Sequence, residues 1–326
     1  MARGRLPEVA AFLRKVIAEG CERPEFRDLV TRLLARPGRV LSGLGPARWP
    51  GYVLSPCQAL GGNTAVALGA VAAVEFAMAA GDVVDDVVDH DWEGTAEEAA
   101  RALNASLGLL ALAQRCLEGL AEPLGQGRAL LINRIFSRGV LAACDGEDLD
   151  LLLEASTTVS EEEAHDMTVR KSGSLIAAAC QMGAACATDE PRILELVGTF
   201  GSHVGALSQL LNDIAGADEG GSDLQRRKKT LPIAYALRCA REESLRDIAA
   251  WYGGAAGAEG AGARQLAAVI RDTGALQYAW VVADVHRREA LASLAALAQA
   301  SGREEVRELR RLVPSVRARR RSRESP

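Results

Sequence analysis

A run of aspartates near residue 85 is the first feature of the sequence whose side chains could do chemistry. Asp82, Asp85, Asp86 and Asp89 follow an apolar stretch, and on a helix residues four apart share a face. Like charges at this spacing repel, and their neighbours in sequence are apolar rather than basic, so the cluster requires a cation from elsewhere. Carboxylate oxygens suit Mg²⁺, which shares its coordination shell with water and substrate phosphates. The alternative is a solvated acidic helix end.

A second polar segment combines oxygen ligands with lysines. Gln209, Asn212 and Asp213 lie close together in sequence, and Lys228 and Lys229 precede a Thr-Leu-Pro sequence. Carboxylates that hold Mg²⁺ beside lysines that contact phosphate oxygens are suited to a departing diphosphate. A lysine pair before a proline, taken alone, is typical of a solvated turn.

A third candidate cation stands between these two segments. Residues 170–173 read Arg-Lys-Ser-Gly and form a polar break before an apolar helix that begins near Leu175. The ammonium of Lys171 is a compact point charge that could contact the same phosphate. The combination of the three segments favours a diphosphate site over three unrelated surface features.

The elements that must position these residues are helices. Leu, Val and Ala recur at three- and four-residue steps, and alternating strand patterns are nearly absent. Gly and Pro predict a loop or broken segment over 37–62 and a surface loop over 253–262. We therefore predict an all-α protein with one domain over 1–310 and a basic, disordered tail over 311–326. The predicted helices span 8–20, 64–90, 96–120, 126–143, 161–187, 191–216, 229–241, 264–274 and 276–300.

Composition excludes several classes of protein. Hydrophobic residues make up 48% and charged residues 25% of the chain, which indicates a globular protein and excludes a disordered one. The net charge of −5, with excess arginine confined to the tail, argues against nucleic-acid binding. Seven cysteines without a C-x-x-C pair indicate free thiols in a reducing compartment. Neither a signal peptide nor an apolar run near the roughly 18 residues of a membrane span is found, so we predict a cytoplasmic protein.

These motifs together resemble those of the trans-isoprenyl diphosphate synthases, the polyprenyl synthetase family. The likeness runs from about residue 57 to 300. Its motifs are Asp85-Asp86-x-x-Asp89 for the first D-D-x-x-D, Gly146 to Asp150 for G-Q-x-x-D, Lys171 for K-[ST]-[GA]-x-L, Gln209, Asn212 and Asp213 for Q-x-x-D-D, and Lys228 with Thr230-Leu-Pro for K-x-T-L-P.

The resemblance implies a large helical bundle of the class I isoprenoid synthase type around a central apolar cavity, assembled as a homodimer. It implies Mg²⁺, with three ions when an allylic prenyl diphosphate is bound. The implied metal ligands are Asp85, Asp89, Asn212 and Asp213, and the implied diphosphate ligands are Lys171, Lys228 and Lys229. The residues expected to act in catalysis are Asp85, Asp86, Asp89, Lys171, Gln209 and Asp213, with Asp86 contacting the metals through water.

The cavity wall beneath the first motif is expected to be Val74, Ala77, Ala80 and Gly81. These small side chains leave a deep pocket, so we expect an allylic substrate of farnesyl length or longer. Close helix packing is the alternative reason for Ala80 and Gly81.

The chain departs from the family where isopentenyl diphosphate is normally held. The family's G-K-R-x-R-P loop corresponds to residues 45–50, which lack the Lys-Arg pair, its histidine corresponds to Met78, and no arginine pair follows Asp89. Each lost charged hydrogen bond is worth about 1.5–3 kcal/mol, so tight binding of isopentenyl diphosphate in the usual place is not expected.

The second motif also departs from the family. Asn212 and Gly216 replace two aspartates, and Asp218 and Glu219 are candidates for the missing oxygen. A closer likeness is to the ComQ-type enzymes, which transfer a prenyl group to a tryptophan of a peptide. They share the Asp82-x-x-Asp85 spacing and have also lost much of the isopentenyl site.

We predict a prenyltransferase that ionises an allylic diphosphate and releases diphosphate. The acceptor stays open: isopentenyl diphosphate, a peptide or none. A terpene cyclase acting on a substrate of farnesyl or geranylgeranyl length or longer is the alternative, and a non-catalytic partner subunit is a second one. The four histidines share no metal-ligand spacing and receive no catalytic role: His90, His165, His203 and His286.

Overall fold

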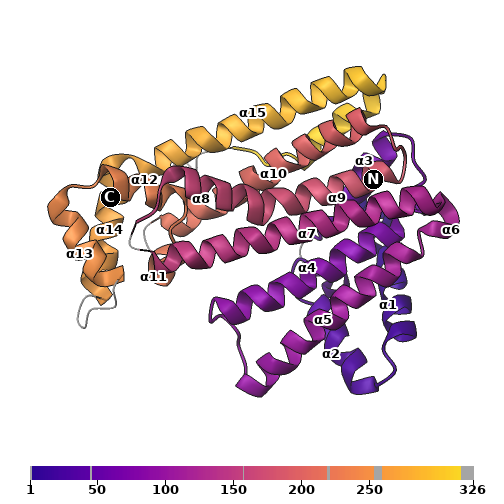
Figure 1. Cartoon of the computed structure of the whole chain (residues 1–326), viewed down its shortest axis with the longest axis horizontal. Helices are drawn as coiled ribbons and strands as arrows, with labels where there is room; N and C mark the ends of the chain where they lie inside the picture. The colour runs from indigo at the N-terminus through magenta and orange to yellow at the C-terminus, as the bar shows by residue number, and fades with distance from the viewer. Residues whose placement is uncertain (1, 45, 157, 219–220, 253–258, 317–326) are drawn as a thin grey trace, which may run out of the picture. The chain divides into compact units, whose positions relative to one another are not determined.

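The computed structural model describes residues 2–44, 46–156, 158–218, 221–252 and 259–316. These residues form helices joined by short connections, and no strand occurs among them (Figure 1). The prediction of an all-α protein is therefore confirmed. Predictions that concern Glu219, residues 253–258 and residues 317–326 lie outside the described residues. In the part of the chain that is described, no helix combines the length and the apolar character that a membrane crossing requires.

The chain divides into two compact units, and each is described by itself. The first unit comprises Met1–Leu141, Leu175–Gly201 and Ser293–Leu312, and the second comprises Ala142–Ser174, Ser202–Ala292 and Val313–Pro326. Three long helices contribute residues to both units: α7 (Gln126–Ala155), α10 (Pro191–Ala217) and α15 (Ala275–Ser301). The prediction of one domain over 1–310 stays a prediction.

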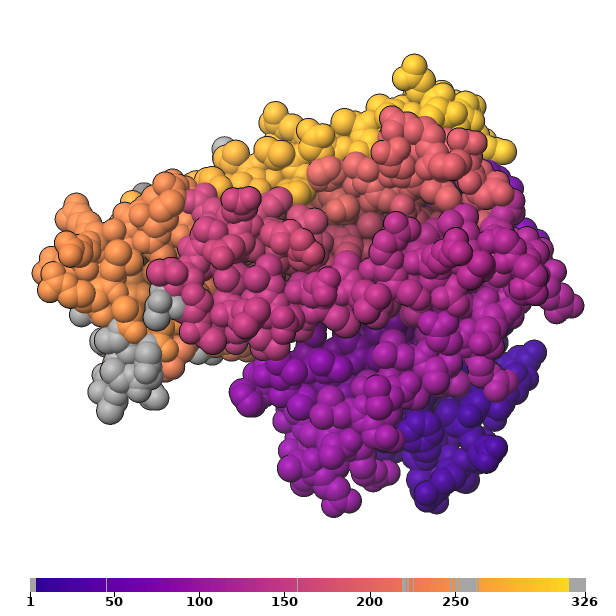
Figure 2. All heavy atoms as spheres, in the orientation of Figure 1, coloured from indigo at the N-terminus to yellow at the C-terminus, as the bar shows by residue number. Residues whose placement is uncertain are grey.

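The first unit is built on α4 (Leu68–Val88), which is buried from Gly69 to Ala80. Its Ala, Val and Gly side chains are apolar on all sides, as expected of a helix with neighbours around it. It contacts α5 and several shorter helices of the unit. The space-filling view shows the side chains of α1 and α2 abutting those of α5 (Figure 2). The other helices of the unit are η1 (Ala2–Arg5), α1 (Leu6–Gly20), α2 (Pro24–Leu34), η2 (Val40–Ser42), α3 (Trp49–Ala59), α5 (Ala96–Glu118), α6 (Ala121–Leu124), α9 (Ser174–Ala185, all but its first residue) and η4 (Glu304–Leu312).

The second unit has two apolar clusters. One joins the end of α10 to α12, α13 and α14, with Ile233 and Leu266 fully buried. The other joins α8, α10, α12 and α15 around Leu207 and Leu210. Besides the shared helices, the unit contains α8 (Glu161–Thr168), the π-helical turn η3 (Val169–Gly173), α11 (Ser222–Arg226), α12 (Leu231–Cys239), α13 (Glu242–Tyr252) and α14 (Glu259–Thr273).

Several segments differ from the sequence prediction. Helices α2 and α13 were not predicted, α7 continues past residue 143 to Ala155, and α14 begins at Glu259, inside the predicted loop 253–262. Residues 49–59 of the predicted loop form α3, in which Pro50 stands in the first turn, where its missing N–H costs no hydrogen bond, and Pro56 lies inside the helix. Residues 311 and 312 of the predicted tail belong to η4, where Val306 and Leu309 are buried on one face.

Three of the four histidines meet in the second unit, on α8, α10 and α15. His165 Nε2 lies 2.9 Å from His286 Nε2, and His203 Nδ1 lies 3.0 Å from His286 Nδ1. Burial and the two neighbouring rings lower the pKa of His286 to about 4, and burial lowers the pKa of His203, whereas the charge of Glu289 raises it. The sequence did not predict this cluster, because its members are far apart along the chain.

We expect the free energy of unfolding to fall by about 2 kcal/mol between pH 7 and pH 4.5 through His286 alone. A base whose pKa is lower in the folded protein stabilises it above the unfolded value near 6.5, and this stability is lost as the pH falls toward 4. Urea unfolding at several pH values, compared between the wild type and His286→Gln, measures the effect. An identical pH dependence in both proteins would contradict it.

Candidate functional site

In the first unit, the aspartate-rich segment forms the C-terminal end of α4. Asp82, Asp85 and Asp86 lie in its last two turns and Asp89 caps it. The helix ends because His90 adopts a left-handed backbone conformation, with φ of 58°, and the Asp91 N–H donates to the Asp86 carbonyl at 2.7 Å. The predicted helical spacing of the four carboxylates is thus present.

Two of these carboxylates are paired with arginines of the same unit. Arg39 donates to Asp82 through Nε at 2.9 Å and through Nη2, and also to the Met78 carbonyl at 2.7 Å. Arg36 forms an ion pair with Asp86. These arginines are more than 40 residues away along the chain, so the basic partners of Asp82 and Asp86 are not visible among their neighbours in sequence.

A further carboxyl group, Glu75, lies two turns before Asp82 and is fully buried. Its Oε2 accepts from the Val40 N–H at 3.3 Å, while Oε1 has no hydrogen-bond partner. Burial raises its pKa to about 7, against the opposing effect of the Arg39 charge. Glu75 was not among the predicted site residues, although a lone glutamate within an apolar run is a visible signal in the sequence.

In the second unit, Lys171 stands in the π-helical turn η3, a conformation common at functional sites. Its ammonium forms ion pairs with Glu147 and with Asp150, the latter at 3.0 Å. Gly146 permits this approach of α7, since a Cβ there would collide with the backbone nitrogen of Lys171. The G-x-x-x-D segment and the lysine therefore form one charged group.

The second motif surrounds a buried carboxyl group. Asp213 is 2% exposed and accepts a hydrogen bond from Gln209 Nε2 at 2.8 Å, and Ser172 Oγ donates to Gln209 Oε1 at 2.8 Å. The other oxygen of Asp213, Oδ2, is buried without a hydrogen-bond partner. Burial raises the pKa of Asp213 to about 7, and the negative charges of Asp223 and Asp150 add to that increase. Asn212, by contrast, points from an exposed position of α10.

Gly216 stands where the family has a third aspartate, and the space of its missing side chain is filled. A Cβ on Gly216 would collide with the carboxylate of Asp223, which is carried by α11. Asp223 also accepts from Thr230 Oγ1 at 3.3 Å. Asp218 and Glu219 were the predicted candidates for the missing oxygen. Asp223, which follows them in sequence and lies against Gly216, was not predicted.

The two lysines before Thr230 have different surroundings. Lys228 lies 3.5 Å from Asp150 and 3.7 Å from Glu154. Lys229 is 1% exposed and donates to the carbonyls of Leu153 and Glu154 at 2.8 and 2.7 Å, at the C-terminal end of α7. Its ammonium also lies 4.3 Å from the centre of the Tyr252 ring. Lys229 therefore caps the C-terminal end of α7, and its role in binding diphosphate stays a prediction.

The residues expected to line the substrate pocket are mostly buried on α4. Val74, Ala77 and Ala80 are between 4% and 5% exposed. Gly81 is exposed, and no atom lies within 4 Å of the position its Cβ would take. The prediction that these four residues form the cavity wall stays a prediction.

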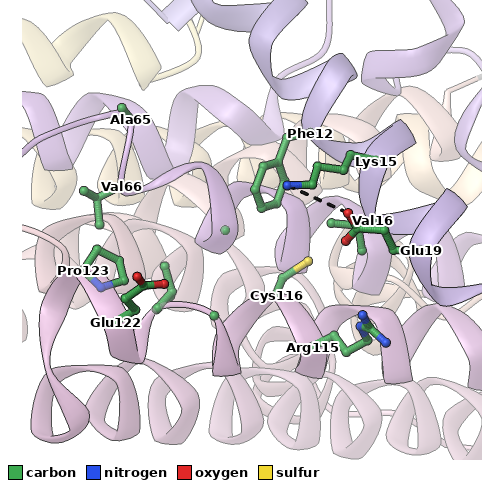
Figure 3. Close-up of a pocket in the computed structure, with 13 residues that line it drawn as sticks. Phe12, Lys15, Val16, Glu19, Ala65, Val66, Arg115, Cys116, Glu122 and Pro123 are labelled. Atoms are coloured by element: carbon green, nitrogen blue, oxygen red, sulfur yellow. Dashed lines mark ion pairs between the residues drawn. The ribbon is translucent and has the colours of Figure 1, made fainter.

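A cavity of about 550 Å³ lies elsewhere in the first unit, beside the first turn of α4 (Figure 3). Apolar residues from α1, α5 and α6 line it, and an ion pair between Lys15 and Glu19 stands at its edge (Figure 3). Gly69 of this cavity is about 24 Å along the helix from Asp85. The cavity is therefore separate from the aspartates at the end of α4.

The two polar groups fit a hard divalent cation. Among the described residues, no three His, Cys, Asp or Glu side chains are arranged to hold a metal by themselves. Mg²⁺ does not require such a cage, because it retains waters and binds through one or two carboxylates plus substrate phosphates. The unpartnered Oδ2 of Asp213, with a second carboxylate near enough to raise its pKa, provides such an oxygen.

Comparison with known proteins places these residues in a family context. The polyprenyl synthetase family model matches residues 48–268, about two thirds of the chain. A short chain isoprenyl diphosphate synthase of Methanothermobacter thermautotrophicus is 27% identical over 91% of this chain and 95% of its own length.

Solved structures show the same fold. A polyprenyl synthetase from Streptomyces coelicolor A3(2) matches with a TM-score of 0.79 and 23% identity, over 96% of this chain and 98% of that one. A geranylgeranyl pyrophosphate synthase from Corynebacterium glutamicum, complexed with isoprenyl diphosphate and magnesium, matches with a TM-score of 0.76 and 22% identity, over 96% of each chain. The predicted class I isoprenoid synthase fold is confirmed.

The adjacent lysines provide a stability test of the site. We expect Lys229→Met to lower the free energy of unfolding by about 2–3 kcal/mol, because two buried carbonyls lose a charged donor. We expect Lys228→Met to lower it by about 1 kcal/mol or less, because its ion pairs are long. Urea unfolding of both variants measures the difference, and equal losses would contradict the assigned roles.

Proposed function

Because this chain belongs to the polyprenyl synthetase family, we propose that it ionises an allylic prenyl diphosphate and transfers the prenyl group to an acceptor. The family match covers both polar groups, from the aspartates of α4 to the lysines before Thr230. The observation that carries the proposal is Asp213, a buried carboxyl group with one oxygen unpartnered beside a second carboxylate. Such an arrangement is costly without a cation.

The second unit supplies the leaving-group side of the reaction. Asp213, with Asn212 beside it, offers metal ligands, and Gln209 holds the Asp213 carboxyl in place. Lys171 and Lys228 share the carboxylates of α7. They exchange these partners for phosphate oxygens when diphosphate binds, and so favour departure of the diphosphate.

In the first unit, Asp85 and Asp89 are the metal ligands we propose for the first aspartate motif. When bound, Mg²⁺ neutralises the diphosphate and stabilises it as a leaving group. The allylic C–O bond then breaks with its electron pair leaving on oxygen. An electron pair of the acceptor forms the new bond to the prenyl cation, and a proton departs. The small side chains of Ala77 and Ala80 are the basis on which we propose an allylic substrate of farnesyl length or longer.

The acceptor we propose first is isopentenyl diphosphate, since relatives of this chain are named as isoprenyl diphosphate synthases. The residues that normally bind isopentenyl diphosphate in the family are altered here. Met78 stands where the family has a histidine, and the Met78 carbonyl accepts a hydrogen bond from Arg39. A different acceptor is therefore an outcome that the assay must be able to detect. Exposed leucines on α5 and α7 support the homodimer that the resemblance implies: Leu107, Leu130 and Leu141.

The first test incubates the purified chain and MgCl₂ with geranyl, farnesyl or geranylgeranyl diphosphate, each with and without isopentenyl diphosphate. Longer diphosphates that require isopentenyl diphosphate are the expected products, identified by mass spectrometry. Cyclic products from the allylic substrate alone would show a cyclase instead. If no substrate is turned over, peptide acceptors are tested next, and failure with these as well would favour a non-catalytic partner subunit.

We expect Asp85→Asn and Asp213→Asn each to lower kcat/KM by about 100-fold or more, because each removes a charged ligand used in the ionisation step. Asp148→Asn removes an exposed carboxylate of α7 and serves as the matched control, with a change of about twofold or less. Equal activity of Asp213→Asn and the control would contradict the role of the second unit.

We further propose that Asp223 provides the oxygen that Gly216 lacks. The change Asp223→Gly is expected to weaken binding of magnesium pyrophosphate by about 10-fold. The double variant Gly216→Asp/Asp223→Gly returns a carboxylate to the same space and is expected to recover most of that loss. Isothermal titration calorimetry measures both, and a double variant no better than the single one would overturn this assignment.

A further inference from the structure

The end of α4 holds four carboxylates within eight residues, in the first unit. Neighbours at this spacing repel one another even in water, and more when partly buried. The side chains of Asp82 and Asp86 are 43% and 26% exposed. The helix therefore needs compensating positive charge even before any ligand binds.

For Asp82 and Asp86, that charge comes from a short turn between α2 and η2. Gly38 has φ of +84°, which a residue with a side chain rarely adopts, and the Arg39 N–H donates to the Arg36 carbonyl at 3.1 Å. The turn places two guanidinium groups three residues apart. Their partners, Asp82 and Asp86, lie one helical turn apart, so the two spacings match.

Each arginine is held firmly. Arg39 is 5% exposed and is fixed by Asp82 and the Met78 carbonyl together. The guanidinium of Arg36 lies 6.0 Å from the centre of the Trp92 ring as well as against Asp86. A planar guanidinium suits such combined contacts better than a lysine ammonium.

This turn is not an anion site, although Arg36 and Arg39 each have one buried N–H group without a hydrogen-bond partner. The two positive charges face Asp82, Asp86 and the buried Glu75, so they leave no positive excess for a second diphosphate. Their effect is therefore on the carboxylates of α4.

We propose that Arg36 and Arg39 are positioning residues that hold Asp86 and Asp82 as internal ion pairs and so keep these two carboxylates out of the metal coordination proposed for the end of α4. The inference rests on the proposed function. Loss of an arginine releases a carboxylate beside the proposed metal ligands Asp85 and Asp89. The added negative charge repels pyrophosphate, and the released oxygen competes for Mg²⁺.

The test is a double-mutant cycle read by calorimetric binding of MgCl₂ with inorganic pyrophosphate. Arg36→Gln is expected to weaken pyrophosphate binding by about 10-fold. In an Asp86→Asn background, the same change is expected to alter it by less than about threefold, because the carboxylate that Arg36 restrains is gone. The pair Arg39→Gln and Asp82→Asn is expected to behave alike, with Arg39→Lys as the variant that keeps the charge.

Arg23→Gln is the matched control, since its side chain is 82% exposed and it removes the same charge. Circular dichroism melting of every variant verifies folding, and a variant that fails to fold is replaced by its partner pair. Equal losses in both backgrounds would show that the arginine contacts pyrophosphate directly and would overturn the proposal. No loss in either background would overturn it as well.

The binding cycle is separable from the proposed function. If the wild type binds magnesium pyrophosphate but forms no prenyl product, the proposed function fails while the cycle still decides the role of the arginines. If the wild type does not bind magnesium pyrophosphate, α4 holds no such metal pair and the positioning role is wrong.

Discussion

Repulsion between carboxylates is the constraint on which the candidate site depends. Each polar group gathers more acidic side chains than a folded chain tolerates without partners. In the first unit, two arginines from a tight turn form ion pairs with Asp82 and Asp86. In the second unit, Lys171 and Lys228 both form ion pairs with Asp150. The Oδ2 atom of Asp213 has no hydrogen-bond partner, and burial of this carboxyl group raises its pKa. A site that is short of positive charge in this way is prepared for cations that arrive with an anionic substrate.

Neighbouring residues of one type divide structural and chemical work between them. Lys229 is buried on the carbonyls at the end of α7, whereas Lys228 lies against carboxylates. Asp82 and Asp86 face arginines, whereas Asp85 and Asp89 are proposed to face metal. In both cases a shift of one or a few positions along the chain changes the contacts completely. Lys229 holds in place the backbone that carries Lys228. In the same way, Asp82 and Asp86 hold the backbone that carries Asp85 and Asp89.

The sequence predicted the helices and the polar motifs because both are local patterns. Asp85 and Asp89 are placed by helical spacing alone, and the confirmed all-α fold follows from the same period. What the sequence did not predict depends on distant contacts. The pairing of Arg36 with Asp86 and the occupation of the Gly216 space by Asp223 require chain reversals that no periodicity encodes. The helix at 49–59 was missed because proline and glycine were taken as helix breakers, although Pro50 lies in a first turn.

The three imidazoles of the second unit have one more consequence. In its neutral form, each ring nitrogen of His286 either donates or accepts, so the two hydrogen bonds run in one direction along the cluster. Reversing every tautomer gives a second arrangement with the same two bonds. In one arrangement each donor faces along the order His203, His286, His165, and in the other along the order His165, His286, His203. Both arrangements satisfy the same heavy-atom contacts, so the positions of the three rings do not set the direction of the hydrogen bonds.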